Sequence, residues 1–251
     1  MGAGARMIWF DLDDTLFDHS YSAALGIQRV GQMYSALAGR AVGEFVAFYN
    51  QALNEVYPEY LRGEIDFGEM RRRKLDRFFQ IAGIQRSEVP AVTEFHRIYD
   101  EGYATERRAT PGSMAALQRL RDAGIEIAVL TNGMQRIQEA KLRAIGLEWL
   151  VPHLLTSEQA GATKPDPEIF HWALQRTGRA ANQVVMVGDN LENDVAGALR
   201  IGIRALYYSP AADQQAMVTE FGTAPVISNW EQLAELLHKG PSSPDYLSTA
   251  P

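Results

Sequence analysis

Two aspartates stand one residue apart, directly after a short apolar run near the N-terminus. The run covers residues 7–10, and Asp11 and Asp13 follow it in the segment Asp-Leu-Asp-Asp-Thr. Alternate residues of an extended chain lie on the same side, so both carboxylates should aim at one spot. Like charges this close require a cation between them, or a proton on one of them. A solvated acidic turn or a helix N-cap would also account for these residues, without any chemistry.

Further polar residues follow the later apolar runs of the chain. They are Thr131, Asn132, Gly133, Lys164, Asp189 and Asp194. The first three come after the run 125–130, the last two come after the run 184–187, and the lysine stands between these runs in a Lys-Pro-Asp-Pro segment. Ligands of an open α/β sheet bind beyond the carboxyl ends of its strands. We therefore expect these side chains and the first two aspartates to form one site.

The residue types of this set indicate phosphoryl chemistry. A phosphate dianion enters an acidic site only when a hard divalent cation neutralises the site, and carboxylate oxygens suit Mg²⁺. One carboxylate can then attack phosphorus, while a second one, held protonated by its neighbours, donates to the leaving oxygen and later activates water. Thr131, the loop amides beside Asn132, and Lys164 can hold the phosphoryl oxygens.

Composition narrows the class of protein. The 251 residues are 46% hydrophobic, carry a formal net charge of −7 and include no cysteine. Disulfides, thiol catalysis and zinc–thiolate sites are thereby excluded. The negative charge argues against a nucleic-acid polymer as partner, whereas a small phosphorylated metabolite remains compatible. No run approaches a membrane span or a signal sequence, so we expect a cytoplasmic protein, as a monomer or homodimer.

The rhythm of the chain predicts an α/β fold with a doubly wound parallel sheet. Short, nearly continuous apolar runs separated by helical stretches are typical of strands that are buried on both faces. The predicted strands cover residues 7–10, 125–130, 154–155, 184–187, 205–208 and 225–227. A last helix is predicted over residues 230–237, and residues 239–251 form a tail that we expect to be disordered.

The interval between the first two strands has a different pattern. Its apolar residues recur at helical spacing over 42–60, 67–79 and 92–103, with no convincing strand. A crossover needs far fewer residues, so we expect an inserted all-helical subdomain over 18–107, within a core of 1–17 and 108–238. The basic run Arg71–Lys74 lies in this insert and is interpreted as a solvated face, with contact to substrate as the alternative.

The ordered motifs resemble the haloacid dehalogenase (HAD) superfamily of phosphohydrolases. They are Asp-Leu-Asp-Asp-Thr-Leu, Thr-Asn-Gly, Lys-Pro and Gly-Asp-Asn-Leu-Glu-Asn-Asp, and the match spans about residues 7–237. The resemblance implies a Rossmann-like core, and the helical insert resembles the type-one cap of that family. That family's dehalogenase branch lacks an acid two residues after the nucleophile, so Asp13 favours phosphoryl transfer.

The resemblance also implies roles for individual residues. Asp11 is the nucleophile and Asp13 the general acid/base. Mg²⁺ is held by the Asp11 and Asp189 side chains and by the Asp13 backbone carbonyl, with Asp194 as chiefly indirect support. Thr131 binds phosphate, and Lys164 pairs with the nucleophile and the transferring group. Asn132 and Gly133 are further substrate-binding candidates. Asp14 is expected to be structural, and the hydroxyl of Thr15 could orient the nucleophile.

The motifs are most similar to those of the pyrimidine 5′-nucleotidase-like branch. The substrates favoured by this similarity are nucleoside 5′-monophosphates. A sugar-phosphate or phosphoglycolate-type phosphatase is the alternative within the family. A receiver-like signalling domain, which also groups aspartates, a threonine and a lysine on a parallel sheet, is the alternative from another class, but such a module has no cause to carry a large helical insert.

Overall fold

The computed structural model describes residues 7–34, 41–85 and 91–233. The chain divides into two compact units, Met1–Asp18 with Arg108–Pro251, and His19–Arg107. We call the first the sheet unit and the second the helical unit. Residues 234–251, and with them most of the predicted last helix and the predicted tail, lie outside the described residues, although residues 230–233 are helical.

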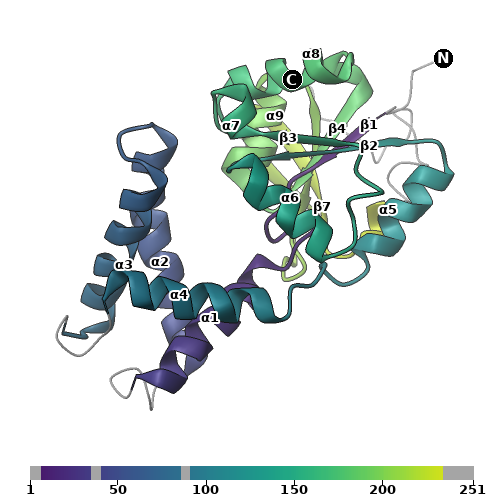
Figure 1. The fold of residues 1–251 in the computed structure, drawn as a ribbon. Helices are drawn as coiled ribbons and strands as arrows, with labels where there is room; N and C mark the ends of the chain where they lie inside the picture. Colours follow the sequence, from purple (N-terminus) through teal and green to yellow (C-terminus); the bar gives the residue numbers. More distant parts are fainter. Residues whose placement is uncertain (1–6, 35–40, 86–90, 234–251) are drawn as a thin grey trace. The chain divides into compact units, whose positions relative to one another are not determined.

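A seven-stranded sheet in the order β3-β2-β1-β4-β5-β7-β6 forms the centre of the sheet unit (Figure 1). Its strands are β1 (Met7–Phe10), β2 (Glu126–Thr131), β3 (His153–Thr156), β4 (Val184–Gly188), β5 (Arg204–Tyr208), β6 (Ala216–Thr219) and β7 (Gly222–Ile227). Neighbouring strands are parallel except for the hairpin of β6 and β7. The predicted α/β class with a mainly parallel sheet is confirmed.

Helices flank this sheet (Figure 1). They are α5 (Ser113–Asp122), α6 (Gln135–Ala144), α7 (Ser157–Ala160), α8 (Pro167–Thr177) and α9 (Gly197–Arg200), with a 3₁₀ turn (Ala181–Gln183) and a π-helical turn (Leu191–Ala196).

The sequence does not predict β6. Its four residues are exposed or half-buried, so no continuous apolar run marks the strand, and pairing with β7 fixes it at the sheet edge.

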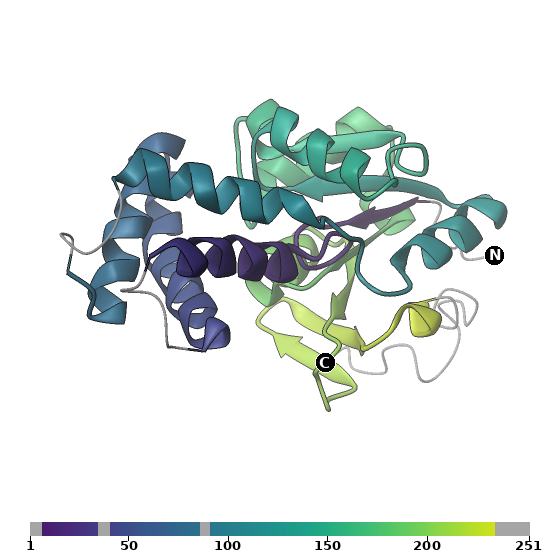
Figure 2. The same cartoon turned by 60° about the horizontal axis from the view of Figure 1, so that its bottom comes forward.

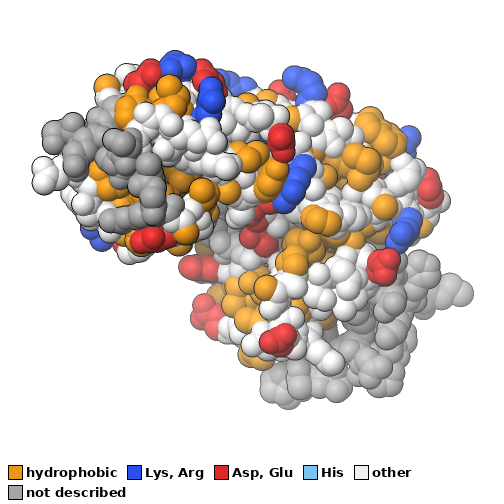
Figure 3. Space-filling view, turned by 90° about the horizontal axis from the view of Figure 1, so that it is seen from below, with side chains coloured by type: hydrophobic (Ala, Val, Ile, Leu, Met, Phe, Trp, Pro, Cys, Tyr) orange, Lys and Arg blue, Asp and Glu red, His pale blue; other side chains and the backbone are white. Residues whose placement is uncertain are grey.

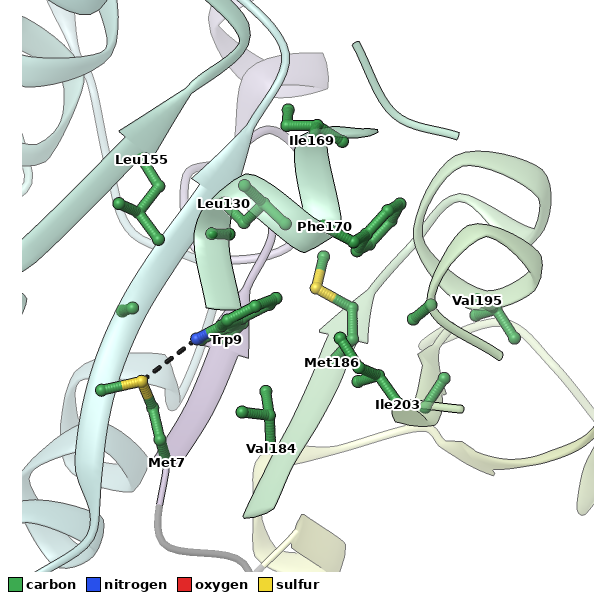
Figure 4. Close-up of a cluster of buried hydrophobic side chains, with 14 of the residues drawn as sticks. Met7, Trp9, Leu130, Leu155, Ile169, Phe170, Val184, Met186, Val195 and Ile203 are labelled. Carbon is green, nitrogen blue, oxygen red and sulfur yellow. Dashed lines mark hydrogen bonds between the residues drawn. The ribbon is translucent and has the colours of Figure 1, made fainter. Parts of the chain in front are cut away.

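The core of the sheet unit lies where β1 and β4 meet α8 and the turn before α9 (Figure 4). Trp9 is fully buried, and its indole N–H donates to the Met7 sulfur at 3.1 Å. Gly197 faces Phe170 so closely that an added Cβ would lie 2.8 Å from the ring. These contacts anchor the central strands whose carboxyl ends carry the polar residues.

The described residues of the helical unit form four helices, of which the sequence pattern predicts the last three but not the first. They are α1 (His19–Met33), α2 (Val42–Leu61), α3 (Phe67–Ala82) and α4 (Val92–Thr105). α1 packs against α4, and α2 packs against α3 (Figure 2). Gly26 and Gly102 permit the first contact, because a Cβ at either position would lie 2.7 Å from atoms of the facing helix. Asp66 caps the start of α3, and Gly83 ends this helix in a left-handed conformation.

The basic run of α3 has two kinds of environment. Arg72 and Arg73 are exposed and form ion pairs with acidic residues, as does the half-buried Arg71, so the solvated interpretation fits the exposed arginines. It is wrong for Lys74, which is buried with its ammonium 4.1 Å from the centre of the Tyr49 ring.

Figure 3 shows basic and acidic side chains interspersed on one face of the molecule. None of the described helices is long and apolar enough to cross a membrane.

Candidate active site

Asp11 is placed by the continuation of β1 beyond its last residue. The Asp11 N–H donates to the Val187 carbonyl of β4 at 2.9 Å, so the aspartate remains tied to the sheet. The chain then turns at Asp14, which has a φ of 58° and whose N–H donates to the Phe17 carbonyl at 2.7 Å. Asp tolerates this left-handed conformation better than most residues. The turn agrees with the structural role expected for Asp14.

Three carboxylates meet at this sheet edge. One oxygen each from Asp11, Asp189 and Asp194 lies within 4.8 Å of the others. The ammonium of Lys164 contacts two of them, at 2.6 Å from Asp11 Oδ1 and 2.5 Å from Asp194 Oδ1, and also donates to the Leu130 carbonyl at 2.9 Å. Lys164 is only 2% exposed, which requires this complete set of acceptors.

The acidic cluster is short of positive charge. Burial raises the pKa of Asp11 to about 7 against the attraction of Lys164, with Asp194 and Asp13 adding to the rise. Burial, followed by repulsion from Asp11 and Asp194, raises the pKa of Asp189 to about 8. Burial alone would lower the pKa of Lys164, but its two aspartate partners raise it above the ordinary value. One ammonium therefore faces three carboxylates, and the raised pKa values of Asp11 and Asp189 follow from burial together with this excess of negative charge.

The donor set fits a hard divalent cation. All three side chains offer oxygen, the atoms lie close enough to share one ion, and the cluster has an excess of negative charge. Thr15 supports this group through Asp189, since its hydroxyl donates to Asp189 Oδ1 at 3.3 Å and accepts from the Asp189 N–H at 3.1 Å. The sequence suggested that the Thr15 hydroxyl orients the nucleophile, Asp11. In the structure the hydroxyl contacts Asp189.

Asp194 reaches the cluster because the chain turns sharply after β4. The Asn190 side chain accepts from the N–H groups of Glu192 and Asn193, which starts the π-helical turn. The Asn190 N–H in turn donates to Asp194 Oδ2 at 3.0 Å. The carboxylate then packs on Gly188, where any Cβ would lie 2.6 Å from the Asp194 Cβ and closer still to the carboxylate.

The loop after β2 brings the remaining predicted residues to the same edge. Thr131 is 1% exposed, and its hydroxyl accepts from the Gln138 side chain at 2.8 Å. The Asn132 side chain forms two hydrogen bonds with the backbone of Lys164, and the Gly133 N–H donates to Ser157 Oγ at 2.9 Å. The Asn132 side chain therefore braces the lysine loop in the structure. Phosphate binding by these three residues stays a prediction.

Asp13 has partners that the sequence did not predict, and one of them is a cation, whereas neighbours that hold this carboxylate protonated were expected. The Lys141 ammonium lies 2.6 Å from Asp13 Oδ1 and 2.7 Å from Oδ2, and Gln138 Nε2 lies 3.4 Å from Oδ2. Both side chains come from α6, which follows the Thr131 loop directly. The available signal is their spacing, because residues three apart share one helix face. An isolated lysine in a helix otherwise indicates only a solvated surface.

A family model and curated relatives both match this chain. The sequence model of a family described as haloacid dehalogenase-like hydrolase matches residues 5–202. The ribulose-1,5-bisphosphate 5-phosphatase of Halopiger xanaduensis is 37% identical over 118 residues, which cover 47% of this chain and 49% of the relative. The pyrimidine 5′-nucleotidase YjjG of Escherichia coli is 25% identical over 235 residues, covering 92% of this chain and 97% of the relative.

Solved structures share the fold. The HAD-hydrolase YfnB from Bacillus subtilis, whose crystal structure contains magnesium, superposes with a TM-score of 0.77 at 19% sequence identity. The superposition covers 94% of this chain and 99% of that one. At this level of identity, the similarity establishes the architecture.

Proposed function

The chain belongs to the haloacid dehalogenase-like hydrolases, and we propose that it is a Mg²⁺-dependent phosphomonoester hydrolase that forms an aspartyl-phosphate on Asp11. The observation that carries the proposal is the environment of Asp11. Its carboxylate is buried, bound by Lys164 at 2.6 Å, and grouped with Asp189 and Asp194. The second aspartate, Asp13, follows at the same sheet edge.

The proposed reaction has two steps. An oxygen of Asp11 bonds to phosphorus, the ester P–O bond breaks, and Asp13 supplies the proton that the leaving alkoxide needs. Water then attacks the phosphorus of the aspartyl-phosphate while Asp13 takes a proton from that water. Inorganic phosphate leaves, and the Asp11 carboxylate is regenerated. Lys164 and the loop of Thr131, Asn132 and Gly133 would hold the phosphoryl oxygens as charge moves.

The acidic cluster is proposed to hold Mg²⁺. The side chains of Asp11 and Asp189 and the backbone carbonyl of Asp13 would bind the ion, and Asp194 would support them from its pairing with Lys164. When bound, the ion supplies the positive charge that lets a phosphate dianion approach the carboxylates. The excess of carboxylates over the single ammonium supports this assignment.

Among substrates, we propose nucleoside 5′-monophosphates first. The support is the similarity, over nearly the full chain, to a relative named pyrimidine 5′-nucleotidase, together with the shared motifs. Sugar phosphates are the second candidate, since another relative is named for a sugar bisphosphate, although that match covers about half of either chain. The helical unit is proposed to act as the cap that selects the leaving group.

The test is hydrolysis of p-nitrophenyl phosphate by the purified protein, followed by a panel of phosphorylated metabolites. We expect turnover with Mg²⁺, loss of turnover with a chelator, and loss of at least about 1,000-fold in kcat for Asp11→Asn. Near-normal turnover by a folded Asp11→Asn protein would contradict the nucleophile assignment. Equal rates across the whole panel would contradict a preference for nucleotides.

A further inference from the structure

Helix α6 carries two buried polar side chains three residues apart. Gln138 is 1% exposed and Lys141 is 7% exposed. Lysine is almost never buried to this degree without a partner, because removing an ammonium from water costs several kcal/mol. The spacing places both residues on one helix face. Their burial therefore requires a group in front of that face which binds both.

That group is the carboxylate of Asp13. Lys141 Nζ contacts both oxygens, at 2.6 and 2.7 Å, and also lies 5.5 Å from the centre of the Phe17 ring. Gln138 Nε2 lies 3.4 Å from Asp13 Oδ2 while donating to Thr131 Oγ1 at 2.8 Å and to the Asn132 carbonyl at 3.1 Å. One amide thus links Asp13 to the loop after β2.

Gly133 makes room for this amide. Its φ is +143°, and an added Cβ would lie 3.0 Å from Gln138 Nε2 and 3.3 Å from Cδ. A residue with a side chain would be strained at this φ and would press on the Gln138 side chain. The Thr-Asn-Gly segment therefore provides both the space for Gln138 and two of its acceptors.

We propose that Lys141, together with Gln138, is a positioning residue that fixes the carboxylate of Asp13 for its part in the reaction. The inference rests on the proposed function, in which Asp13 transfers the proton. The side chain of Asp13 is 31% exposed and stands just beyond a strand end. Contacts to both oxygens restrict rotation about χ1 and χ2, which an acid/base group within hydrogen-bond reach of substrate requires.

Stability alone does not explain the pair. An ion pair with a partly exposed carboxylate contributes little to folding, whereas burial of the lysine is costly. An unbranched apolar side chain at position 141 would keep the packing of α6 and remove that cost. Lys141 is also not needed to pair Asp11 or Asp194, because Lys164 contacts both. The remaining role is to hold Asp13.

The test compares Lys141→Met with Lys141→Arg, using Arg143→Met as the control. Arg143 is an exposed cation of the same helix. With Mg²⁺ present, kcat/KM is measured on phenyl phosphate, a poor leaving group that needs the proton, and on 2,4-dinitrophenyl phosphate, which does not. We expect Lys141→Met to lose about 10- to 100-fold on phenyl phosphate and less than about 3-fold on the dinitrophenyl ester. Lys141→Arg should retain most activity, and the control should match the wild type.

A double-mutant cycle with Asp13→Asn gives the decisive comparison. If Lys141 acts through Asp13, adding Lys141→Met to Asp13→Asn should change kcat/KM for phenyl phosphate by less than about 2-fold. A multiplicative loss would overturn the proposal. An equal loss of kcat/KM on both esters in Lys141→Met would also overturn it, since that is the signature of a structural role. A kcat/KM for phenyl phosphate at or above the wild-type value would overturn it as well.

Two further measurements keep the outcome interpretable. If Lys141→Met fails to fold, as judged by its thermal midpoint, Lys141→Gln and Gln138→Leu replace it in the same comparison. Should the wild type hydrolyse neither ester, or Asp13→Asn show no selective loss on phenyl phosphate, the proposed function fails. If the wild type hydrolyses both esters and Asp13→Asn loses activity selectively on phenyl phosphate, but the Lys141 variant is unaffected, only the inference about positioning is contradicted.

Discussion

The side chain of Asn132 binds the backbone of Lys164 at two points. Asn132 Oδ1 accepts from the Lys164 N–H at 2.8 Å, and Nδ2 donates to the Lys164 carbonyl at 2.9 Å. The two residues belong to different loops, one after β2 and one before α8. The amide thereby ties these loops together and fixes the point from which the lysine side chain reaches Asp11.

Asn132→Ala should therefore disturb catalysis through Lys164. The change removes two hydrogen bonds and leaves both backbone groups to find new partners, at a cost of about 1–3 kcal/mol in the free energy of unfolding. We expect kcat for p-nitrophenyl phosphate to fall about 10- to 100-fold as the ammonium loses its fixed position. Steady-state kinetics and urea unfolding measure the two effects.

Asn132→Asp separates the two hydrogen bonds. Its carboxylate can still accept from the Lys164 N–H but places an oxygen against the Lys164 carbonyl and adds a negative charge beside the acidic cluster, so its kcat should be no higher than that of Asn132→Ala. Asn182→Ala, an exposed site on the 3₁₀ turn, serves as the control. Unchanged kcat in Asn132→Ala would show that the lysine holds its position without this brace.

Magnesium should stabilise the protein through the acidic cluster. With three carboxylates around one ammonium, binding of a divalent cation to the folded state raises the melting temperature by mass action. We expect Mg²⁺ to raise Tm by several degrees and a chelator to reverse the rise. Asp189→Asn should lose most of the shift, whereas Asp213→Asn, at an exposed position, should keep it. A full Mg²⁺ shift in Asp189→Asn would exclude this residue as a ligand.

The sheet and its polar edge could be predicted from local pattern. The strands β1 and β4 are fully buried, so continuous apolar runs mark them, and the residues after each run must lie at the carboxyl edge. The same rule placed Asp11 and Asp189 together. The family assignment, confirmed by the match over residues 5–202, depends on these motifs in order.

The partners of those residues could not be predicted in the same way. Lys141 and Gln138 are ordinary helix residues, and only the packing of α6 in front of Asp13 gives them a role. Lys74 fell within a run of charges, yet its neighbours Arg72 and Arg73 are exposed while Lys74 is buried. Charge type predicts exposure on average, but which residue of a helix faces the core depends on the helices around it.

Lys74 should give the helical unit a measurable pH dependence. Burial, reinforced by the nearby Arg71 and opposed by Asp100, lowers the pKa of Lys74 from 10.5 to about 7. Between pH 7 and pH 10.5 the unfolded chain binds more protons at this site than the folded chain does. The contribution of Lys74 to the free energy of unfolding therefore rises with pH in this range. Lys74→Met should raise the free energy of unfolding at pH 7 by about 2 kcal/mol, since the variant buries no ammonium.

The gain from Lys74→Met should shrink as the pH rises from 7 toward 10. In that range the folded state holds a neutral amine while the unfolded chain is still protonated, and the cost of removing that proton falls as the pH approaches 10.5. Urea unfolding of both proteins across this range measures the difference, in which the other titrating groups cancel. Arg72→Met, on the exposed face of α3, should show a difference that is flat with pH. A gain that stays constant, or increases toward pH 10, would contradict the buried ammonium.

Gly188→Ala tests how closely the end of β4 fits Asp194. The added methyl would lie 2.6 Å from the Asp194 Cβ and closer still to its carboxylate, so one of the two must move. Moving Asp194 breaks its contact with Lys164, which is buried and ion-paired, and we expect a loss of about 3–5 kcal/mol in the free energy of unfolding. Gly43→Ala, in a helix with open space around it, should be neutral or stabilising.

The same variant separates packing from chemistry when it is combined with Asp194→Asn. If the methyl acts by displacing the carboxylate from Lys164, its destabilising effect should be smaller once that charged contact is already weakened by the amide. Non-additivity of more than about 1 kcal/mol in a double-mutant cycle of unfolding free energies is the expected result. Additive losses would mean that Gly188 is required by the strand itself, and that Asp194 keeps its contact with Lys164 in Gly188→Ala.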